Sequence, residues 1–569
     1  MTKLGKFIFT LVILGIAAFA FFQWLPDADP PTASPGAPGG SSSDPADPAD
    51  PADAGAPAGD PLDSDVFIAV PDQPERLPGA QTYQMDGDTL VIELSEYAGY
   101  AGLIVANGGL EPNADSFFAQ TYGFQVRLTL SEEDSWAALQ RGEMAASATT
   151  VDVLACIGRQ FQAVVPAQIA FSRGADGIIV RKEIRRINDL KGKIVAAAPF
   201  NETEFFIRYL AQEANLPVKR LASPAEQTDP EAVNLVFAED AFQAADAFLA
   251  DLESGGDTIA GCVTWAPKTT EVVEASNGRA RQLVDNKNLL IISDILIFNK
   301  GFADAEPEKV KGIVHGLLHG NDLVRNNPGQ HAAAIADAFK EFEWTAEDAT
   351  EELSKIHLSN LPENLAFFSG ATDASGSFES IYGSAVLAYG SKTVPNPAPA
   401  GHFVDTSALE ALQAENHFAG QEIAIRPVRS SDRSPIESDP LLSKDIRFLF
   451  EPNSAQLDMA EPANTEYLTT IRKMLQVSPG SIVLLRGHVD DSLVPEFREQ
   501  GGEAFVRTMA LKAMELSKQR AEEIQSQLLA MFPTLTPERI EMIGRGWEEP
   551  LGPDPDPNRR VEVQWFTVE

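Results

Sequence analysis

The sequence predicts an α/β fold of two lobes, followed by a smaller α+β domain and preceded by one transmembrane helix. Strand-like and helix-like segments alternate from residue 90 to about residue 324, which is typical of an α/β sheet with parallel strands. The alternation restarts at Gly177, as a second sheet would require. A separate set of strands and helices follows residue 445, and an uncharged apolar run occupies residues 7–25.

Length and charge exclude several classes of protein. The chain has 569 residues, with 83 acidic against 44 basic side chains and a formal net charge of −39. This length predicts two to four domains. Nine of the negative charges are aspartates within residues 27–65, which leaves −30 on the rest of the chain. Because nucleic-acid binding requires a basic surface, we expect no nucleic-acid partner.

The apolar run at residues 7–25 predicts a membrane segment. At about 1.5 Å per residue, an α-helix of this length reaches across a bilayer. Two lysines precede it, so the positive-inside rule places the rest of the chain on the periplasmic side. A cleaved signal peptide is the alternative, because Ala18-Phe19-Ala20 has the small-x-small form. The continuation of the run through Trp24 and Leu25 favours an uncleaved inner-membrane anchor.

Residues 27–80 predict a disordered linker. Their first part consists mainly of Pro, Ala, Asp, Gly and Ser, and Asp-Pro-Ala repeats three times between Asp44 and Asp53. Such a composition cannot bury enough apolar surface to offset the entropy of ordering. We expect a tether that lets the later domains lie away from the membrane.

Two motifs suggest the family of the middle domain. Asp189-Leu190-Lys191-Gly192-Lys193 precedes a strand, and Thr264-Trp265-Ala266-Pro267 closes another. At this spacing they resemble type II periplasmic solute-binding proteins, in particular the branch that binds nitrate, sulfonates, taurine or a thiamine precursor. The resemblance implies a two-lobed periplasmic-binding-protein fold over residues 81–400, with the ligand in a cleft between the lobes. It places lobe 1 at 82–178 and 290–400, and lobe 2 at 179–289, with crossings near 177–180 and 289–294.

Candidate solute-binding residues follow from the geometry of such a cleft, where strand ends and helix N-termini face the ligand. They are Ser95, Glu96, Tyr97, Thr149, Thr150, Asn201, Thr203 and Trp265. Asn201 and Thr203 are equally suited to capping a helix, and Trp265 to packing in a core. Glu96, if it faces the cleft, would repel a small anion, which favours a ligand with an amine or hydroxyl groups over nitrate.

We therefore expect a binding protein and no enzyme. The sequence shows no nucleophile–base pair, and its one His pair at helical spacing, His315 and His319, lacks a third ligand, so we predict neither a metal site nor a cofactor. The resemblance implies the substrate-binding component of an ABC transporter, with an ABC permease as a partner that the sequence leaves open. The alternative is a wall-anchored sensor or scaffold, in which this domain docks a protein and serves no transport.

Five motifs define the C-terminal module at residues 445–569, which a connector at 401–444 precedes. In order they are F-x-x-N-S from Phe450, G-H-x-D from Gly487, L-S-x-x-R-A from Leu516, G-x-G from Gly544 and N-R-R-V-E from Asn558. This ordered set resembles the OmpA-like peptidoglycan-binding domain. The resemblance implies an α+β fold that binds peptidoglycan without catalysis.

The resemblance assigns ligand contacts to Asp490, Arg520, Asn453 and Arg560. The free end of a diaminopimelate stem carries an ammonium and a carboxylate on one carbon. Asp490 would bind the ammonium, and the planar fork of Arg520 the carboxylate. A structural ion pair, with Arg560 as a brace, is the alternative. Two departures stand out, since Val489 replaces the usual Thr and the stretch from Asp490 to Arg520 is unusually long.

Together these features predict an envelope protein of a Gram-negative bacterium, held in the inner membrane with its bulk in the periplasm. A membrane helix plus this C-terminal domain also resembles flagellar stator proteins. Such a proton-driven stator needs an ionisable group in its membrane helix, and residues 7–25 contain none.

Overall fold

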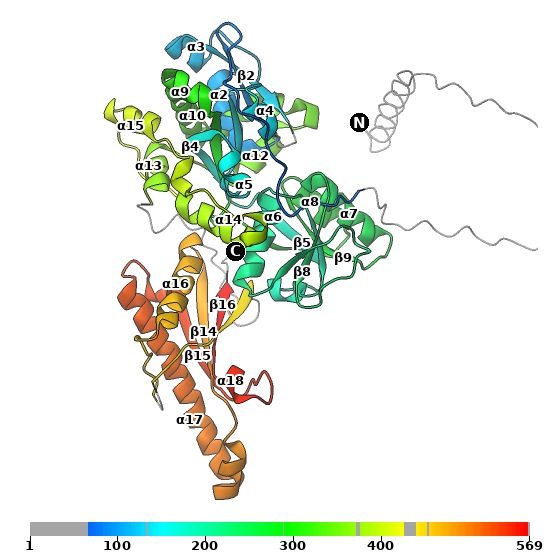
Figure 1. Cartoon of the computed structure of the whole chain (residues 1–569), viewed down its shortest axis with the longest axis vertical. Coiled ribbons are helices and arrows are strands. Elements are labelled where there is room, and N and C mark those ends of the chain that lie inside the picture. Colours follow the sequence, from blue (N-terminus) through cyan, green and yellow to red (C-terminus); the bar gives the residue numbers. More distant parts are fainter. Residues whose placement is uncertain are drawn as a thin grey trace, which may run out of the picture. The chain divides into compact units, whose positions relative to one another are not determined.

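The computed structural model describes residues 66–131, 135–287, 289–370, 376–425, 440–451, 454–478 and 480–566. Three β-sheets organise this part of the chain, two of six strands and one of four (Figure 1). The predicted anchor at 7–25 and most of the predicted linker lie outside the described residues. Within the described ranges, the search for a helix long and apolar enough to cross a membrane finds none.

The first sheet belongs to lobe 1 and has the strand order β12-β4-β11-β3-β1-β2. Its strands are β1 (Thr89–Leu94), β2 (Gln125–Leu130), β3 (Ala146–Thr150), β4 (Ala163–Ser172), β11 (Ser293–Asn299) and β12 (Ile356–Leu358). Strand β1 runs parallel to β2 and β3, whereas β11 is antiparallel to both β3 and β4. All ten residues of β4 are buried, which fits an apolar strand covered on both faces.

Helices complete lobe 1. They are α2 (Ala101–Asn107), α3 (Phe117–Tyr122), α4 (Trp136–Gln140), α5 (Val151–Ile157), α9 (Lys300–Ala305), α10 (Pro307–Asn326), α11 (Pro328–Ala338), α12 (Ala346–Leu353), α13 (Leu361–Ser369), α14 (Phe378–Thr393) and α15 (Ser407–Ala414). The long helix α10 packs closely on α2, because Gly102 and Gly320 lack side chains where the two backbones meet.

The second sheet belongs to lobe 2 and has the order β10-β5-β9-β6-β8-β7. Its strands are β5 (Asp176–Arg181), β6 (Ile194–Ala197), β7 (Val218–Arg220), β8 (Val233–Phe237), β9 (Ile259–Trp265) and β10 (Ala280–Asp285), and its helices are α6 (Glu202–Glu213), α7 (Ala241–Glu253) and α8 (Lys268–Ala275). The chain passes between the sheets from β4 to β5 and again from β10 to β11. The first predicted crossing, 177–180, falls inside β5 and therefore just after the passage at 173–175. The second, 289–294, covers the passage and the first two residues of β11.

The predicted linker boundary at residue 80 is too late. Phe67 is buried, and the backbone N–H of Ile68 donates to the carbonyl of Phe237 at 2.8 Å. This hydrogen bond forms a bridge to the end of β8 in lobe 2. The apolar triplet Val66-Phe67-Ile68 follows the Pro/Ala/Asp segment directly and provides the apolar side chains for this contact.

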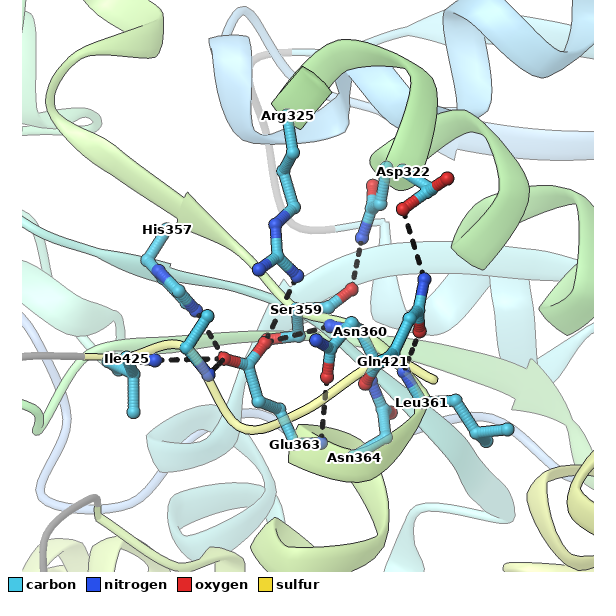
Figure 2. Close-up of polar contacts among 12 residues, drawn as sticks. Asp322, Arg325, His357, Ser359, Asn360, Leu361, Glu363, Asn364, Gln421 and Ile425 are labelled. Carbon is cyan, nitrogen blue, oxygen red and sulfur yellow. Dashed lines mark hydrogen bonds and ion pairs between the residues drawn. The ribbon is translucent and has the colours of Figure 1, made fainter. Parts of the chain in front are cut away.

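The first part of the predicted connector belongs to lobe 1. Residues 407–414 form α15, and the backbone at 424–425 is held by the carboxylate of Glu363 (Figure 2). That carboxylate accepts hydrogen bonds from Nε2 of His357 at 2.9 Å and from the backbone N–H groups of Asn360, Ala424 and Ile425 at 2.8–3.0 Å. Nη1 of Arg325 lies 3.3 Å from Oε2 of the same carboxylate. The connector in the described chain is therefore shorter than predicted.

The third sheet forms the C-terminal domain, with the order β13-β16-β14-β15. Its elements are β13 (Leu442–Ile446), α16 (Pro462–Val477), β14 (Ile482–His488), α17 (Val494–Met531), β15 (Ile540–Gly546), α18 (Pro555–Asn558) and β16 (Val561–Phe566). The long stretch after Asp490 becomes the first half of α17, with a break at Gly501 and Gly502. The buried residues of α17 begin only at Ala513, so this first half lies outside the core.

We predict that Glu363→Gln lowers the thermal stability of lobe 1 by about 2–4 kcal/mol, because buried donors would lose a charged acceptor. Burial alone would raise the pKa of Glu363, but its hydrogen bonds to His357 and the backbone hold that pKa below its usual value. The stabilisation is thus present above the ordinary glutamate pKa and lost as the pH falls through the lowered one. Calorimetry of the full chain at a series of pH values should show that the difference in stability between the unchanged protein and Glu363→Gln disappears in acid. Glu347→Gln, on an exposed part of α12, is the control and should leave the transition unchanged.

Candidate functional sites

A cavity lies between the two lobes, where strand ends from both sheets meet. Lobe 1 contributes the carboxyl ends of β1, β3 and β4, the start of β11 and residues beside β2 and α4, and lobe 2 contributes the start of β5, the end of β9 and the N-terminus of α6. The polar and aromatic lining residues are Glu93, Ser95, Tyr97, Tyr100, Ser131, Ser135, Trp136, Ser147, Thr149, Thr150, Ser172, Asp176, Asn201, Glu202, Trp265 and Asp294. This is the place that the parallel topology of an α/β sheet offers to a ligand.

Six of the eight predicted solute-binding residues line this cavity: Ser95, Tyr97, Thr149, Thr150, Asn201 and Trp265. Asn201 also caps α6, because its side-chain oxygen accepts from the N–H of Thr203 at 3.1 Å. Trp265 packs against Phe242, with ring centroids 5.3 Å apart, and still borders the cavity. Both residues therefore make a structural contact and also border the cavity.

Glu96 and Thr203 are not among the lining residues. The Glu96 carboxylate is buried and accepts a hydrogen bond from Nε1 of Trp344. The Thr203 hydroxyl lies within α6 and its preceding turn, donating to the side-chain oxygen of Asn201 at 2.7 Å. For Thr203 the structure shows the capping environment, and for Glu96 an anchoring contact within lobe 1.

Four acidic residues that sequence reasoning missed line the cavity, namely Glu202 at the start of α6 and three that are buried. Glu93, Asp176 and Asp294 are 8%, 5% and 3% exposed, respectively. Asp176 and Asp294 stand at the two passages of the chain between the lobes. The available signal was the presence of a carboxylate inside or beside an apolar strand, where burial is costly without a partner or a purpose.

Burial dominates the electrostatics of these carboxyl groups. It raises the pKa of Asp176 to about 6, although hydrogen bonds from the Ser172 hydroxyl and from Nδ2 of Asn286, the latter at 3.0 Å, oppose the change. Burial, with the negative charge of Asp176 nearby, raises the pKa of Asp294 well above the ordinary value. Burial likewise raises the pKa of Glu93, against hydrogen bonds from three neighbouring serines.

The second candidate site is on the C-terminal domain, around Asp490. Its carboxylate oxygen Oδ2 lies 2.6 Å from Nε of Arg559, and Oδ1 accepts from the hydroxyl of Ser492. Burial alone would raise the pKa of Asp490, but these hydrogen bonds lower it below the ordinary value. The Arg559 side chain is 49% exposed, so the pair sits at the surface.

Arg520 lies near this pair without a direct ion pair to Asp490 among the described residues. Its guanidinium stacks over the ring of Phe450 at 4.9 Å, and Nε donates to the carbonyl of Ser454 at 3.4 Å. Burial lowers the pKa of Arg520, and repulsion from Arg559 lowers it further, against the attraction of Asp490. The three charged groups therefore share one electrostatic neighbourhood.

The other two predicted contacts have different outcomes. Asn453 lies outside the described residues. Arg560 is 7% exposed and turns inward, where Nε lies 2.9 Å from Oδ1 of Asp445 on β13 and both terminal nitrogens approach the carbonyl of Glu549. The structure thus places Arg560 as a brace within the fold.

One group of side chains in the described residues has metal-ligand spacing, formed by His488, Glu549 and Glu562. Arg486 binds both of its carboxylates, at 2.6 Å to Glu562 and 2.8 Å to Glu549. Burial alone would raise the pKa of Glu562, but hydrogen bonds from His488, Gln564 and Arg486 lower it to about 2. The arginine already supplies the positive charge of this cluster.

Comparison with known proteins confirms the predicted resemblance for the C-terminal domain. Residues 449–564 match the OmpA family model. They contain Asp490 and Arg520, and they form the OmpA domain of this chain. No curated protein gives a significant match to the chain.

The two-lobed part is similar to solved structures of periplasmic solute-binding proteins. Similar solved structures include the aliphatic sulphonate binding protein SsuA of Escherichia coli, with 15% identity and a TM-score of 0.42, covering 57% of this chain and 100% of that one. SsuA of Xanthomonas axonopodis pv. citri bound to MOPS is 13% identical, with a TM-score of 0.40, and the match covers 57% of this chain and 99% of that one. The nitrate-binding protein NrtA of Synechocystis PCC 6803 is 11% identical, with a TM-score of 0.40, and the match covers 57% of this chain and 89% of that one. Similarity at this level carries no information about the ligand of this chain.

We predict effects of different size for the two neighbouring arginines. Arg560→Met should lower the thermal stability of the OmpA domain by about 1–3 kcal/mol, because Asp445 and the Glu549 carbonyl lose buried donors. Arg559→Met removes a half-exposed partner and should change stability by less than about 1 kcal/mol. Urea unfolding followed by Trp fluorescence would measure both. Equal losses for the two variants would contradict the bracing role of Arg560.

Proposed function

We propose that this chain is a cell-envelope protein that binds a small solute between its two lobes and attaches non-covalently to peptidoglycan through its OmpA domain. The solute-binding part rests on one observation, the cavity where strand ends of both sheets meet. The cavity is of the kind that closes on a ligand when two lobes hinge together. Its role is binding, in the manner of the substrate-binding component of an ABC transporter.

The charges around Asp490 support binding to the diaminopimelate stem. An exposed ion pair contributes about 0–1 kcal/mol, so a ligand ammonium can replace Arg559 on the Asp490 carboxylate at low cost. Among the described residues Arg520 makes one long hydrogen bond, which leaves most of its donors for a carboxylate. An anion and a cation are thus available side by side for the two charges on one carbon of the stem.

The wall contact can be tested with a charge-matched pair of double variants. Asp490→Ala with Arg520→Ala should reduce co-sedimentation of the full chain with purified peptidoglycan at least about tenfold, since each charged hydrogen bond contributes about 1.5–3 kcal/mol. The control is Asp491→Ala with Arg507→Ala, both exposed and carrying the same change of charge. Wall binding retained by the first double variant would refute the assignment, as would an equal loss in the control.

We also propose that residues 7–25 remain as an inner-membrane anchor and that the other domains lie in the periplasm. Support comes from the length of the uncharged run and the lysines before it. The full chain, expressed in a Gram-negative host, should stay with inner membranes after carbonate washing. Its intact mass should include residues 1–26. A mature protein that begins just after Ala20 would show cleavage instead.

A further inference from the structure

We propose that the interlobe cavity binds a small organic cation with at least one ammonium group. This inference rests on the proposed solute-binding function and assigns the chemical class of the solute. Four carboxylates line the cavity, those of Glu93, Asp176, Glu202 and Asp294. Among the described residues no Lys, Arg or His lines it.

The Asp294 carboxyl group shows that the acidic character is directed at a ligand. It is 3% exposed, and its Oδ2 has no hydrogen-bond partner of ordinary geometry among the described residues, although an interaction with the Tyr97 hydroxyl opposes the rise that burial causes in the pKa of the carboxyl group. A buried acceptor without a donor costs about 1–3 kcal/mol, which an ammonium donor in the cavity would recover. Asp176, by contrast, already accepts from Ser172 and Asn286 and has no cationic partner among the described residues.

The walls of the cavity also suit an ammonium group. Tyr97, Tyr100, Trp136 and Trp265 all border it, and aromatic faces attract a desolvated cation. Tyr97 and Tyr100 lie edge to face, with centroids 5.3 Å apart. Serine and threonine hydroxyls supply the remaining polar surface, and they can serve hydroxyl or carbonyl groups on the same ligand.

An anion would meet no matching charge here. The positive features at this cavity are the N-termini of α6 and α5. Asn201 caps α6 and Glu202 occupies its first turn, while α5 begins after Thr150 and has Asp152 in its first turn. A sulfonate or nitrate would therefore lie among carboxylates without a counter-charge. A bare metal ion is also disfavoured, because Asp176 and Asp294 do not belong to a group with metal-ligand spacing in the described residues.

The empty and the occupied cavity should differ in protonation. The ionisable groups whose charges act on Asp294 are Asp176 on β5, Asp152 on α5, Tyr97 and Tyr100, while Glu93 and Glu202 border the same space. All are acidic or phenolic. Burial raises the pKa of Asp176 to about 6 and that of Asp152 to about 7, so a bound cation should displace protons from this group. Cation binding should therefore tighten as the pH rises from 5 to 8.

Calorimetric titration and thermal shift of the full chain provide the test. The probes are a diamine such as putrescine, the quaternary ammonium ions choline and glycine betaine, the amino acid arginine, the anions taurine, methanesulfonate and nitrate, and the metal ions Mg²⁺ and Zn²⁺. We expect at least one ammonium probe without a sulfonate to bind, with affinity about tenfold or more higher at pH 8 than at pH 5. Binding by taurine, methanesulfonate or nitrate alone, or by a metal ion alone, overturns the inference and leaves solute binding intact.

Two conservative variants and a control locate the site. Asp294→Asn and Asp176→Asn should each weaken binding of that ammonium probe at least tenfold, while Asp115→Asn, on an exposed loop of lobe 1, should not. If one of the two variants fails to fold, the other still decides. Unchanged affinity in a folded variant overturns the inference. If no probe binds and native mass spectrometry finds no co-purified molecule, the proposed solute-binding function fails together with it, whereas wall binding is judged separately by co-sedimentation.

Discussion

The return of the chain to lobe 1 as β11 is the constraint on which the two-lobed architecture depends. This strand inserts between β3 and β4 and pairs antiparallel with both, so the first sheet is continuous only when residues 293–299 are in place. Everything from β5 to β10 is consequently an insertion between two halves of one sheet. The two passages that this insertion requires carry Asp176 and Asp294, and both residues become part of the cavity between the lobes.

The two candidate sites place their carboxylates in opposite electrostatic settings. Asp490 lies near the surface, and its partner is the half-exposed side chain of Arg559. Burial alone would raise the pKa of Asp490, but the hydrogen bond from Arg559 lowers it. Asp294 lies buried close to the negative charge of Asp176, and burial together with that charge raises its pKa. The first arrangement permits exchange of one cation for another at small cost. The second is destabilised while empty, so a ligand that supplies positive charge gains more from binding there.

The sequence signals for the two candidate sites differ in kind. The OmpA motifs identify Asp490 and Arg520 because they combine several residue types in fixed order, and the family match confirms that resemblance. The pairing of Asp490 with Arg559 joins residues 69 positions apart and depends on the pairing of β14 with β16, which no local pattern records. At the end of β1, Glu93 borders the cavity whereas Glu96 contacts Trp344 in lobe 1. That difference depends on the turn after the strand, which the alternation of apolar residues does not specify.

Domain boundaries failed where short apolar segments interrupt polar stretches. Phe67 and Ile68 follow a composition that predicts disorder. Nevertheless, the Phe67 side chain is buried and the backbone of Ile68 bonds to Phe237 at the end of β8. Residues 421–425 look like part of a connector, but the backbone N–H groups of Ala424 and Ile425 donate to the Glu363 carboxylate. In both cases a tertiary partner more than fifty residues away decides the outcome. The net charge of −39 is similarly uninformative about sites. Asp294 differs from most acidic residues in its burial and in the lack of a donor on Oδ2 among the described residues, and not in the sign of its charge.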